Sequence, residues 1–461
     1  MIRLLNAYFP RRILTLILSE SFLTMLALTA AVSASSRSDL ELVLTYEQGF
    51  LKIVVVSAVC LLCMYYYDLY DSSILQSLVE VTTRLIQGLG TACLVMGLLY
   101  YVYPTLQLGP RTFLVGISLV GACLMGSRRL FFTVNRSARF AERAILLGSG
   151  DLAHSLAEEI KRRPEVGIRL VGYISDSPDE HLDDMRCLGG VADLAEKTRG
   201  LRANRVIVAM TDRRGRLPVE QLLQLKTGGV LVQDGVEVFE RITGKVPLYS
   251  IRLSWLVFSP GFCVSKLMLA KKRLFSIIVS AFGLVVAAPV MALIALAIRL
   301  DSEGPVIFRQ RRVGEGGRLF TLYKFRTMRH QVEADGNFRP AKKNDERFTR
   351  VGGWLRRMRL DELPQLYNIL KGDMDFVGPR PFVPNQEEEC VREIPLYAQR
   401  WSVKPGATGW AQIHRGYCAT LEDNIEKLAY DLYYIKNMSL GLDLLIIFQT
   451  IKISLLGRGG C

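Results

Sequence analysis

Histidine is scarce in this sequence, which has four among 461 residues, and the nine cysteines are scattered. Together they do not form the four-ligand pattern of a structural zinc site. The closest cysteine pair, Cys60 and Cys63, falls within an apolar run, where a helix would bury both thiols. We therefore expect no structural zinc, and soluble parts that stay in a reducing compartment.

Acidic residues are also in deficit, with 44 against 58 basic residues and a formal net charge of +14. Such an excess favours anionic partners such as lipid head groups and phosphates. The chain has no basic tail and no basic helix with interleaved aromatic residues, so we expect no nucleic-acid partner. Hydrophobic residues make up 50% and charged residues 22%, which indicates a protein partly in a membrane and partly in water.

The first third of the chain contains four apolar runs, each close to the length that spans a bilayer core. They are Ile13 to Ala34, Phe50 to Tyr67, Leu85 to Tyr103 and Leu114 to Phe132. The first run is too long for a removed signal peptide and lacks a small-residue cleavage site. Basic residues precede the first run and follow the fourth, so both ends should face the cytoplasm. The sequence predicts a four-helix transmembrane bundle over residues 1–138.

Residues 139–265 show short β-rich runs between helical patterns, which predicts a Rossmann-like α/β domain. The runs are Ala144 to Leu147, Leu170 to Ile174, Val206 to Ala209 and Val230 to Val232. Gly148 and Gly150 follow the first strand and could bring a helix N-terminus against the phosphate of a cofactor. Alternatively, these glycines only make a tight turn in a spacer domain.

Residues 266–461 form the third predicted domain, which opens with an apolar run at about 274–300 that Pro289 interrupts. The run is long enough to cross a membrane. Basic residues lie on both sides, however, and a spanning helix would carry one of those clusters outside. Because proline removes a backbone donor and kinks a helix, we expect a re-entrant helix-break-helix rather than a span.

Four cations of the third domain stand in patterns that suit an anionic ligand. Apolar and polar residues alternate around Lys324 and Arg326 as in a strand, so both would share one face, toward either phosphate or solvent. Arg380 lies between two prolines that would fix its planar fork toward phosphate oxygens. Lys404 adds a cation in another rigid turn.

An acid pair, Asp361 and Glu362, follows an arginine-rich stretch that ends in Arg359. Adjacent acids point in different directions on a helix, so one carboxylate could attack or bind metal while the other serves another part of a reaction. The neighbouring guanidinium groups would keep Asp361 ionised. Such pairs are also common on protein surfaces, so the pair alone does not define a site.

From residue 271 to the C-terminus, the sequence resembles the catalytic domain of the bacterial polyprenyl-phosphate sugar phosphotransferases. Five motifs carry this resemblance, in one order. They are the proline-broken helix, Tyr-Lys-Phe-Arg-Thr-Met (323–328), Asp-Glu-Leu-Pro-Gln (361–365), Val-Gly-Pro-Arg-Pro (377–381) and Lys-Pro-Gly-Ala-Thr-Gly-Trp-Ala-Gln (404–412). The preceding domains extend the likeness to the large branch with a monotopic catalytic domain. The tail, residues 430–459, is similar to the exopolysaccharide members associated with exosortase systems.

The resemblance implies an enzyme at the cytoplasmic face of the bacterial inner membrane that passes a sugar 1-phosphate from a UDP-sugar to undecaprenyl phosphate, starting an exopolysaccharide repeat unit. Asp361 would attack the β-phosphate, release UMP and carry the phosphosugar. Glu362 would assist, and Mg²⁺ near Asp361 would neutralise the diphosphate. A helical hairpin around Pro289 would set the site at the head-group level among the membrane lipids. The family also implies a homodimer. The candidate phosphate-binding residues are Lys324, Arg326, Arg359, Arg380 and Lys404.

Three positions depart from the family pattern. Ala288 stands before the proline where many relatives have serine, so a hydroxyl cap at the break would be missing. Asp375 replaces the common serine ahead of Val-Gly-Pro-Arg-Pro, and His414 stands where asparagine is usual. We expect the last two to bear on which sugar is accepted.

Two other functions compete with the transferase. A membrane-bound nucleotide-sugar dehydratase would need a Tyr-x-x-x-Lys pair, and Tyr367 and Lys371 have that spacing. No glycine fingerprint starts a second nucleotide-binding domain before that pair. A membrane scaffold or nucleotide sensor would rest on the Gly148 motif and leaves the arginines and acids around Asp361 unexplained.

Overall fold

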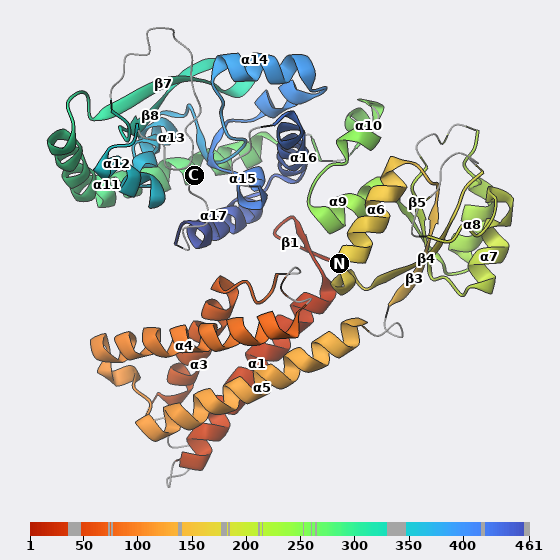
Figure 1. Ribbon diagram of the computed structural model, residues 1–461, viewed down its shortest axis with the longest axis horizontal. Helices are drawn as coiled ribbons and strands as arrows, with labels where there is room; N and C mark the ends of the chain where they lie inside the picture. Colours follow the sequence, from red (N-terminus) through yellow and green to blue (C-terminus); the bar gives the residue numbers. More distant parts are fainter. Residues whose placement is uncertain are drawn as a thin grey trace. The chain divides into compact units, whose positions relative to one another are not determined.

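The computed structural model describes residues 1–35, 48–71, 74, 77–136, 141–176, 182, 185–210, 213, 215–251, 253–259, 261–262, 265–329, 347–415 and 420–455. The chain forms two compact units, drawn in Figure 1. The first unit holds Met1–Ile2 and Tyr8–Ile242, and the second holds Arg3–Ala7 and Thr243–Cys461. Residues 243–265, which the sequence assigns to the central domain, belong with the second unit.

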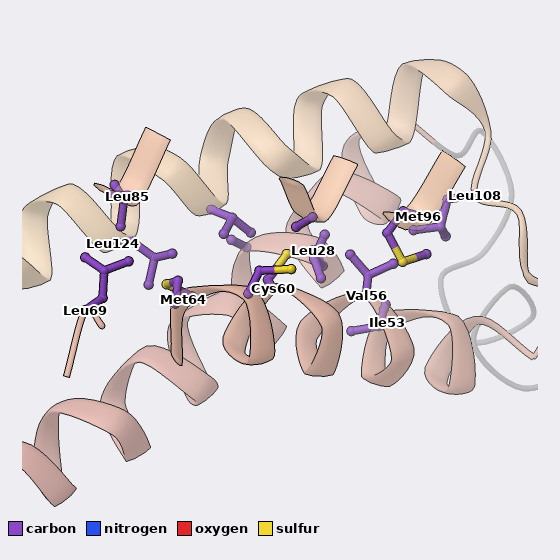
Figure 2. Packing of buried hydrophobic residues seen from close by; sticks show 14 of the residues in the cluster. Leu28, Ile53, Val56, Cys60, Met64, Leu69, Leu85, Met96, Leu108 and Leu124 are labelled. Atoms are coloured by element: carbon purple, nitrogen blue, oxygen red, sulfur yellow. The ribbon is translucent and has the colours of Figure 1, made fainter. Parts of the chain in front are cut away.

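Four long apolar helices open the first unit, and each overlaps one of the predicted runs. They are α1 (Arg11–Ser35), α3 (Gly49–Tyr66), α4 (Leu78–Val102) and α5 (Pro110–Arg136). Leu28, Val56, Met64 and Leu124 from these helices share one hydrophobic core (Figure 2). Apolar side chains such as Phe22 also point outward. A helix that is apolar all round suits a lipid environment, and the four helices are long and apolar enough to cross a membrane.

A closed ion pair joins these helices inside their core. The Arg128 Nε atom lies 2.6 Å from Glu20 Oε1, and both side chains are at most 1% exposed. Tyr70 donates its hydroxyl hydrogen to Glu20 Oε2 over 2.9 Å, and Ser127 donates to Oε1 over 3.2 Å. Arg128 also donates to the carbonyl oxygen of Leu69. The pair therefore connects α1, α5 and the segment between α3 and α4.

The α/β domain of the first unit has four parallel strands in the order β4-β3-β5-β6. They are β3 (Glu142–Leu147), β4 (Ile168–Ile174), β5 (Arg205–Val208) and β6 (Leu231–Asp234). The helices are α6 (Asp151–Arg162), α7 (Leu194–Gly200), α8 (Val219–Thr227) and α9 (Gly235–Thr243). Ile145 and Val206 lie in the buried core of the sheet. All four predicted strands are present.

Packing explains the first glycine after β3. Gly148 has φ 116°, and a Cβ atom there would come within 2.9 Å of the backbone of Ala209, just after β5. The next residue, Ser149, is buried and bonds to the Ser175 hydroxyl over 2.7 Å. The close approach of two chain segments is enough to require glycine. Cofactor binding by Gly148 and Gly150 stays a prediction.

The second unit begins with two helices and a β-hairpin, followed by short elements. These are α10 (Leu253–Phe258), α11 (Lys266–Asp301), β7 (Ile307–Val313), β8 (Leu319–Phe325), α12 (Arg350–Arg357), α13 (Gln365–Lys371), β9 (Asp375–Val377), α14 (Pro384–Glu393), β10 (Gly406–Thr408), α15 (Trp410–His414), α16 (Leu421–Asn437) and α17 (Leu440–Leu455). β7 and β8 pair antiparallel, and β9 pairs with β10 in parallel.

Single turns and short strands complete the described chain. They are β1 (Ile2–Leu4), β2 (Ala7–Phe9), and the 3₁₀ helices η2 (Pro104–Leu106), η4 (Pro164–Val166), η5 (Val191–Asp193), η6 (Leu248–Ser250), η7 (Glu315–Gly317), η8 (Leu360–Glu362) and η9 (Tyr397–Ser402). Part of the tail that resembles the exosortase-associated members, residues 456–459, lies outside the described residues.

Helix α11 runs without interruption through Pro289, so the predicted division into two helices is wrong. Proline removes only one backbone donor, and the helical hydrogen bonds resume on both sides. Each end is bonded to the body of the second unit. Near the start, Arg273 donates to the Ile369 and Leu370 carbonyl oxygens, each over 2.7 Å. Near the end, Asp301 accepts from the Val351 amide over 3.1 Å.

Candidate active site

The predicted catalytic pair lies on η8, the single turn between α12 and α13. Arg359 precedes this turn, and its φ of 55° is a left-handed conformation that non-glycine residues rarely adopt. Asp361 is 7% exposed, and the Glu362 side chain is 18% exposed. Strained backbone of this kind concentrates at functional sites. The sharp turn gives the two carboxylates different surroundings.

Glu362 is held by cations from two other segments. Its Oε1 atom lies 3.0 Å from Lys324 Nζ on β8 and 3.5 Å from Arg380 Nη2 after β9. Burial alone would raise the pKa of Glu362, but Lys324, Arg380 and Arg359 outweigh it and lower that pKa to about 2. Glu362 therefore stays ionised and fixes the two cations in position.

Asp361 has the opposite environment. Burial and then the negative charge of Glu362 raise the pKa of Asp361, while Lys324, Arg356 and Arg380 act in the other direction. The arginines therefore lower the pKa of Asp361, as predicted, but burial and the neighbouring acid raise that pKa by more. Within the described part of the chain, no hydrogen bond or ion pair engages the Asp361 carboxylate. Its oxygen atoms remain available to a ligand.

The two proline-glycine motifs lie against each other. The Gly406 amide donates to the Pro379 carbonyl oxygen over 3.0 Å, and the Gly378 amide donates to that of Thr408 over 2.9 Å. A Cβ atom on Gly406 would come within 2.0 Å of the Gly378 nitrogen, so the contact requires glycine. This contact brings the loop of Lys404 beside the loop of Arg380. The Arg380 side chain is 41% exposed and can reach a ligand.

Two further arginines support the Arg380 loop from behind. Arg400 is 3% exposed and donates to the carbonyl oxygen of Arg380 over 2.9 Å, while its Nε atom bonds to Asp431 over 3.0 Å. Arg312 donates to the Pro381 carbonyl oxygen over 3.1 Å. Burial and the charge of Arg380 lower the pKa of Arg312 to about 10. The sequence does not predict the role of either residue, since no spacing distinguishes a buried arginine from a surface one.

Arg326 is not brought to the acid pair. It is 5% exposed and donates to the Ser302 carbonyl oxygen over 2.7 Å, at the end of α11. The predicted shared face with Lys324 depended on strand alternation, but β8 ends at Phe325. Pro289 is not among the residues that contact the acid pair; it lies in the exposed middle of α11.

The departures Asp375 and His414 both take part in packing. Asp375 is buried and accepts a hydrogen bond from Ser276 of α11 over 3.1 Å, with Lys272 Nζ 3.9 Å away. The His414 ring stacks on Tyr430 with ring centroids 5.0 Å apart. Ala288 lies in a continuous helix and faces outward. Asp375 therefore belongs to the attachment of α11.

The acid pair could hold a metal only together with a ligand. Among the described residues, no group of three or more His, Cys, Asp or Glu side chains could hold an ion. Mg²⁺ often binds through one or two carboxylates together with substrate phosphates and water. Asp361, whose oxygens carry no other bond in the described structure, fits such a shared Mg²⁺ site.

Comparison with known families matches two segments of the chain. Residues 267–457 match the family described as bacterial sugar transferase, and residues 66–224 match a family described as CoA-binding domain. The first segment contains the whole acid and arginine cluster. The second begins at the end of α3 and includes α4, α5 and the α/β domain as far as α8.

Three relatives show how far the similarity extends. An exopolysaccharide production protein of Rhizobium leguminosarum bv. phaseoli is 42% identical over 199 residues, 41% of this chain and 98% of that protein. A UDP-N-acetylgalactosamine-undecaprenyl-phosphate N-acetylgalactosaminephosphotransferase of Aeromonas hydrophila is 42% identical over 226 residues, 48% of this chain and 52% of that protein. An undecaprenyl-phosphate glucose phosphotransferase of Komagataeibacter xylinus is 35% identical over 361 residues, 75% of this chain and 65% of that protein. The alignment thus spans about half to two thirds of the last two.

Proposed function

This chain belongs to the bacterial sugar transferase family, and we propose that it transfers a sugar 1-phosphate from a UDP-sugar to undecaprenyl phosphate. The transfer would release UMP and start an exopolysaccharide repeat unit. The proposal rests on one observation. The Asp361 carboxylate has no bond to another described residue, and it adjoins Glu362, which Lys324 and Arg380 hold in place. The relatives named for undecaprenyl-phosphate sugar transfer support the choice of substrates.

The proposed reaction has two displacements at one phosphorus atom. An Asp361 oxygen attacks the β-phosphorus of the UDP-sugar, and the bond from that phosphorus to the bridging oxygen breaks, so UMP leaves with the electron pair. A phosphate oxygen of undecaprenyl phosphate then attacks the same phosphorus and releases the Asp361 carboxylate. Two easier steps replace one difficult step. A carboxylate that is not bonded to another side chain of the protein keeps its electron pairs available for this attack.

The cations around Asp361 would hold the diphosphate. Arg380 is exposed enough to bind a phosphate oxygen, and Lys324 adds charge from β8. Lys404 would add a further charge from the loop that lies against the Arg380 loop. Glu362 keeps Lys324 and Arg380 in place before the donor arrives, which is electrostatic preorganisation. Mg²⁺, with Asp361 as its protein ligand, would supply further neutralisation of the diphosphate when bound.

We further propose that α11 lies along the cytoplasmic surface of the membrane, with its apolar side chains in the lipid, and does not cross it. A helix of 36 residues is roughly 54 Å long. If α11 crossed the bilayer once, its two ends would lie on opposite sides of a hydrocarbon core about 30 Å thick. Both ends nevertheless bond to the second unit. Apolar side chains in the middle, including Phe282, Val285 and Leu293, are exposed. This arrangement suits a catalytic unit at the cytoplasmic surface of the inner membrane, beside the lipid carrier.

Release of UMP tests the proposed reaction. Detergent-solubilised protein, given UDP-sugars, undecaprenyl phosphate and Mg²⁺, should release UMP, and Asp361→Asn should abolish the release. Asp193→Asn, an exposed aspartate of the first unit, makes the same charge change as a control. Radiolabelled donor should leave an adduct on Asp361. Lipid product that accumulates without any adduct would contradict the proposed intermediate. Cross-linking of the purified protein tests the homodimer that the family resemblance implies.

A further inference from the structure

A cavity of about 300 Å³ lies at the amino ends of the parallel strands in the first unit. Glu142, Ile168, Arg205 and Leu231, the first residues of β3, β4, β5 and β6, all line it. The Gly148 loop follows the carboxyl end of β3, so this cavity is a different site. Ligands of open parallel sheets ordinarily bind at the carboxyl ends of the strands. Neither the family resemblance nor the acid pair explains a cavity at the amino ends.

Arginine dominates the charge of the cavity. Four arginine and two glutamate side chains line it, which leaves a net side-chain charge of +2; they are Arg11, Arg12, Arg205, Arg241, Glu142 and Glu165. Arg205 is paired with Glu142. Arg11 is exposed and has no hydrogen bond or ion pair with any other described residue. The cavity therefore offers a cation that a ligand could engage.

Arg12 is built into the wall. Its Nη1 atom donates to Asn135 Oδ1 over 2.9 Å and to the Pro164 carbonyl oxygen over 3.4 Å. A Cβ atom on Gly167, which has φ 75°, would come within 3.1 Å of the Arg12 Nε atom. Glycine at that position thus leaves room for the guanidinium. Such fixed geometry is what a specific anion site requires.

The remaining wall is apolar, and the cavity lies where the long helices end. Val166, Val238 and Ile242 line it beside the arginines. Arg11 and Arg12 are the first residues of α1, and Asn135 lies in the last turn of α5. If these helices cross the membrane, the cavity lies at the level of the cytoplasmic head groups, where basic pockets bind anionic lipids.

We infer that this cavity binds a phosphate ester, supplied either by the head group of an anionic phospholipid or by a soluble phosphate compound. The bound phosphate would engage Arg11 and Arg241 and would connect α1 and α5 to the α/β domain. The inference concerns a site in the first unit and does not depend on the transferase chemistry.

Chemical modification of Arg11 in the full-length protein tests the inference. Phenylglyoxal modification would be followed by mass spectrometry in detergent, with phosphatidylglycerol, phosphatidylcholine or inorganic phosphate as the added probe. A probe at about ten times its dissociation constant leaves roughly one site in ten open, so modification of Arg11 should slow about tenfold. The exposed Arg199, outside the cavity, should react at an unchanged rate. Protection by phosphatidylglycerol alone indicates the lipid source, and protection by inorganic phosphate indicates the soluble one.

Paired variants separate the cavity from a general effect of charge. In Arg205→Gln/Arg241→Gln, Arg11 should lose its protection, whereas Arg162→Gln/Arg216→Gln, which changes two exposed arginines outside the cavity, should keep it. Equal slowing at Arg11 and Arg199 would mean non-specific adsorption and would overturn the inference. The inference would also be overturned if neither phosphatidylglycerol nor inorganic phosphate changed the rate of modification at Arg11 in the wild-type protein. That result does not depend on the folding of any variant.

Discussion

Two of the regions in which the chain buries carboxylates beside arginines differ in how completely the charges are matched. Among the long helices, Glu20 accepts hydrogen bonds from Arg128 Nη2, Tyr70 and Ser127. In the second unit, Glu362 is bonded to two cations, but no described residue bonds to the carboxylate of Asp361. A fully matched group has nothing left to offer a ligand. The comparison indicates that the first cluster stabilises the fold and that the second is kept incomplete for a reaction.

Removing Glu20 should have the largest effect on stability. Glu20→Ala leaves the buried Arg128 without its carboxylate, which costs about 3–5 kcal/mol of the free energy of unfolding. Thermal unfolding in detergent would measure the loss. The control Glu80→Gln removes an exposed partner of Arg84 and should cost no more than about 1 kcal/mol. A Glu20→Leu/Arg128→Leu variant should recover much of the loss; if Glu20→Ala were as stable as the control, the first cluster would not be structural.

Loss of the Glu362 charge should act on turnover more than on folding. Glu362→Gln frees Lys324 and Arg380 from their anchor, and loss of one preorganised electrostatic contact lowers kcat by about 10²–10³-fold. UMP release under saturating donor would measure it. Glu388→Gln on the surface of α14 is the matched control. Turnover in Glu362→Gln equal to that of the control would refute the anchoring role.

The same residue predicts a pH dependence of stability. The pKa of Glu362 is about 2 in the folded protein against an ordinary 4.5. Because the folded value is depressed, the ionised group stabilises the fold above pH 4.5, and this contribution is lost as the pH falls toward 2. Glu362→Gln should therefore weaken the fall in melting temperature across that range. An identical acid profile for variant and wild type would contradict the depressed pKa.

Local sequence patterns predicted the helices and strands, whose formation depends on residues that are close together in the chain. Apolar runs located the four long helices, and β-rich runs located the strands of the parallel sheet, because both periods arise from local geometry. The sequence also placed Asp361 and Arg380 in one site through family motifs. It could not show that Arg400 is buried behind the Arg380 loop, because that contact joins segments far apart in the chain. Nor could it show that Arg326 bonds to the end of α11, since the end of β8 depends on tertiary packing.

The smallest predicted effect decides whether Asp361 is a reactive residue or one that bonds within the fold. Its raised pKa means that the folded protein holds the proton more tightly than the unfolded chain, so stability falls as the pH rises above 3.8 through the range of that shift. At neutral pH the charge therefore opposes folding, and Asp361→Asn should raise the free energy of unfolding by roughly 0.5–2 kcal/mol while it removes activity. Melting temperatures at pH 7, compared with those of Asp193→Asn, would measure the gain. A stability loss like that of Glu20→Ala would mean that Asp361 is held by bonds within the fold, and the contrast between the two clusters would disappear.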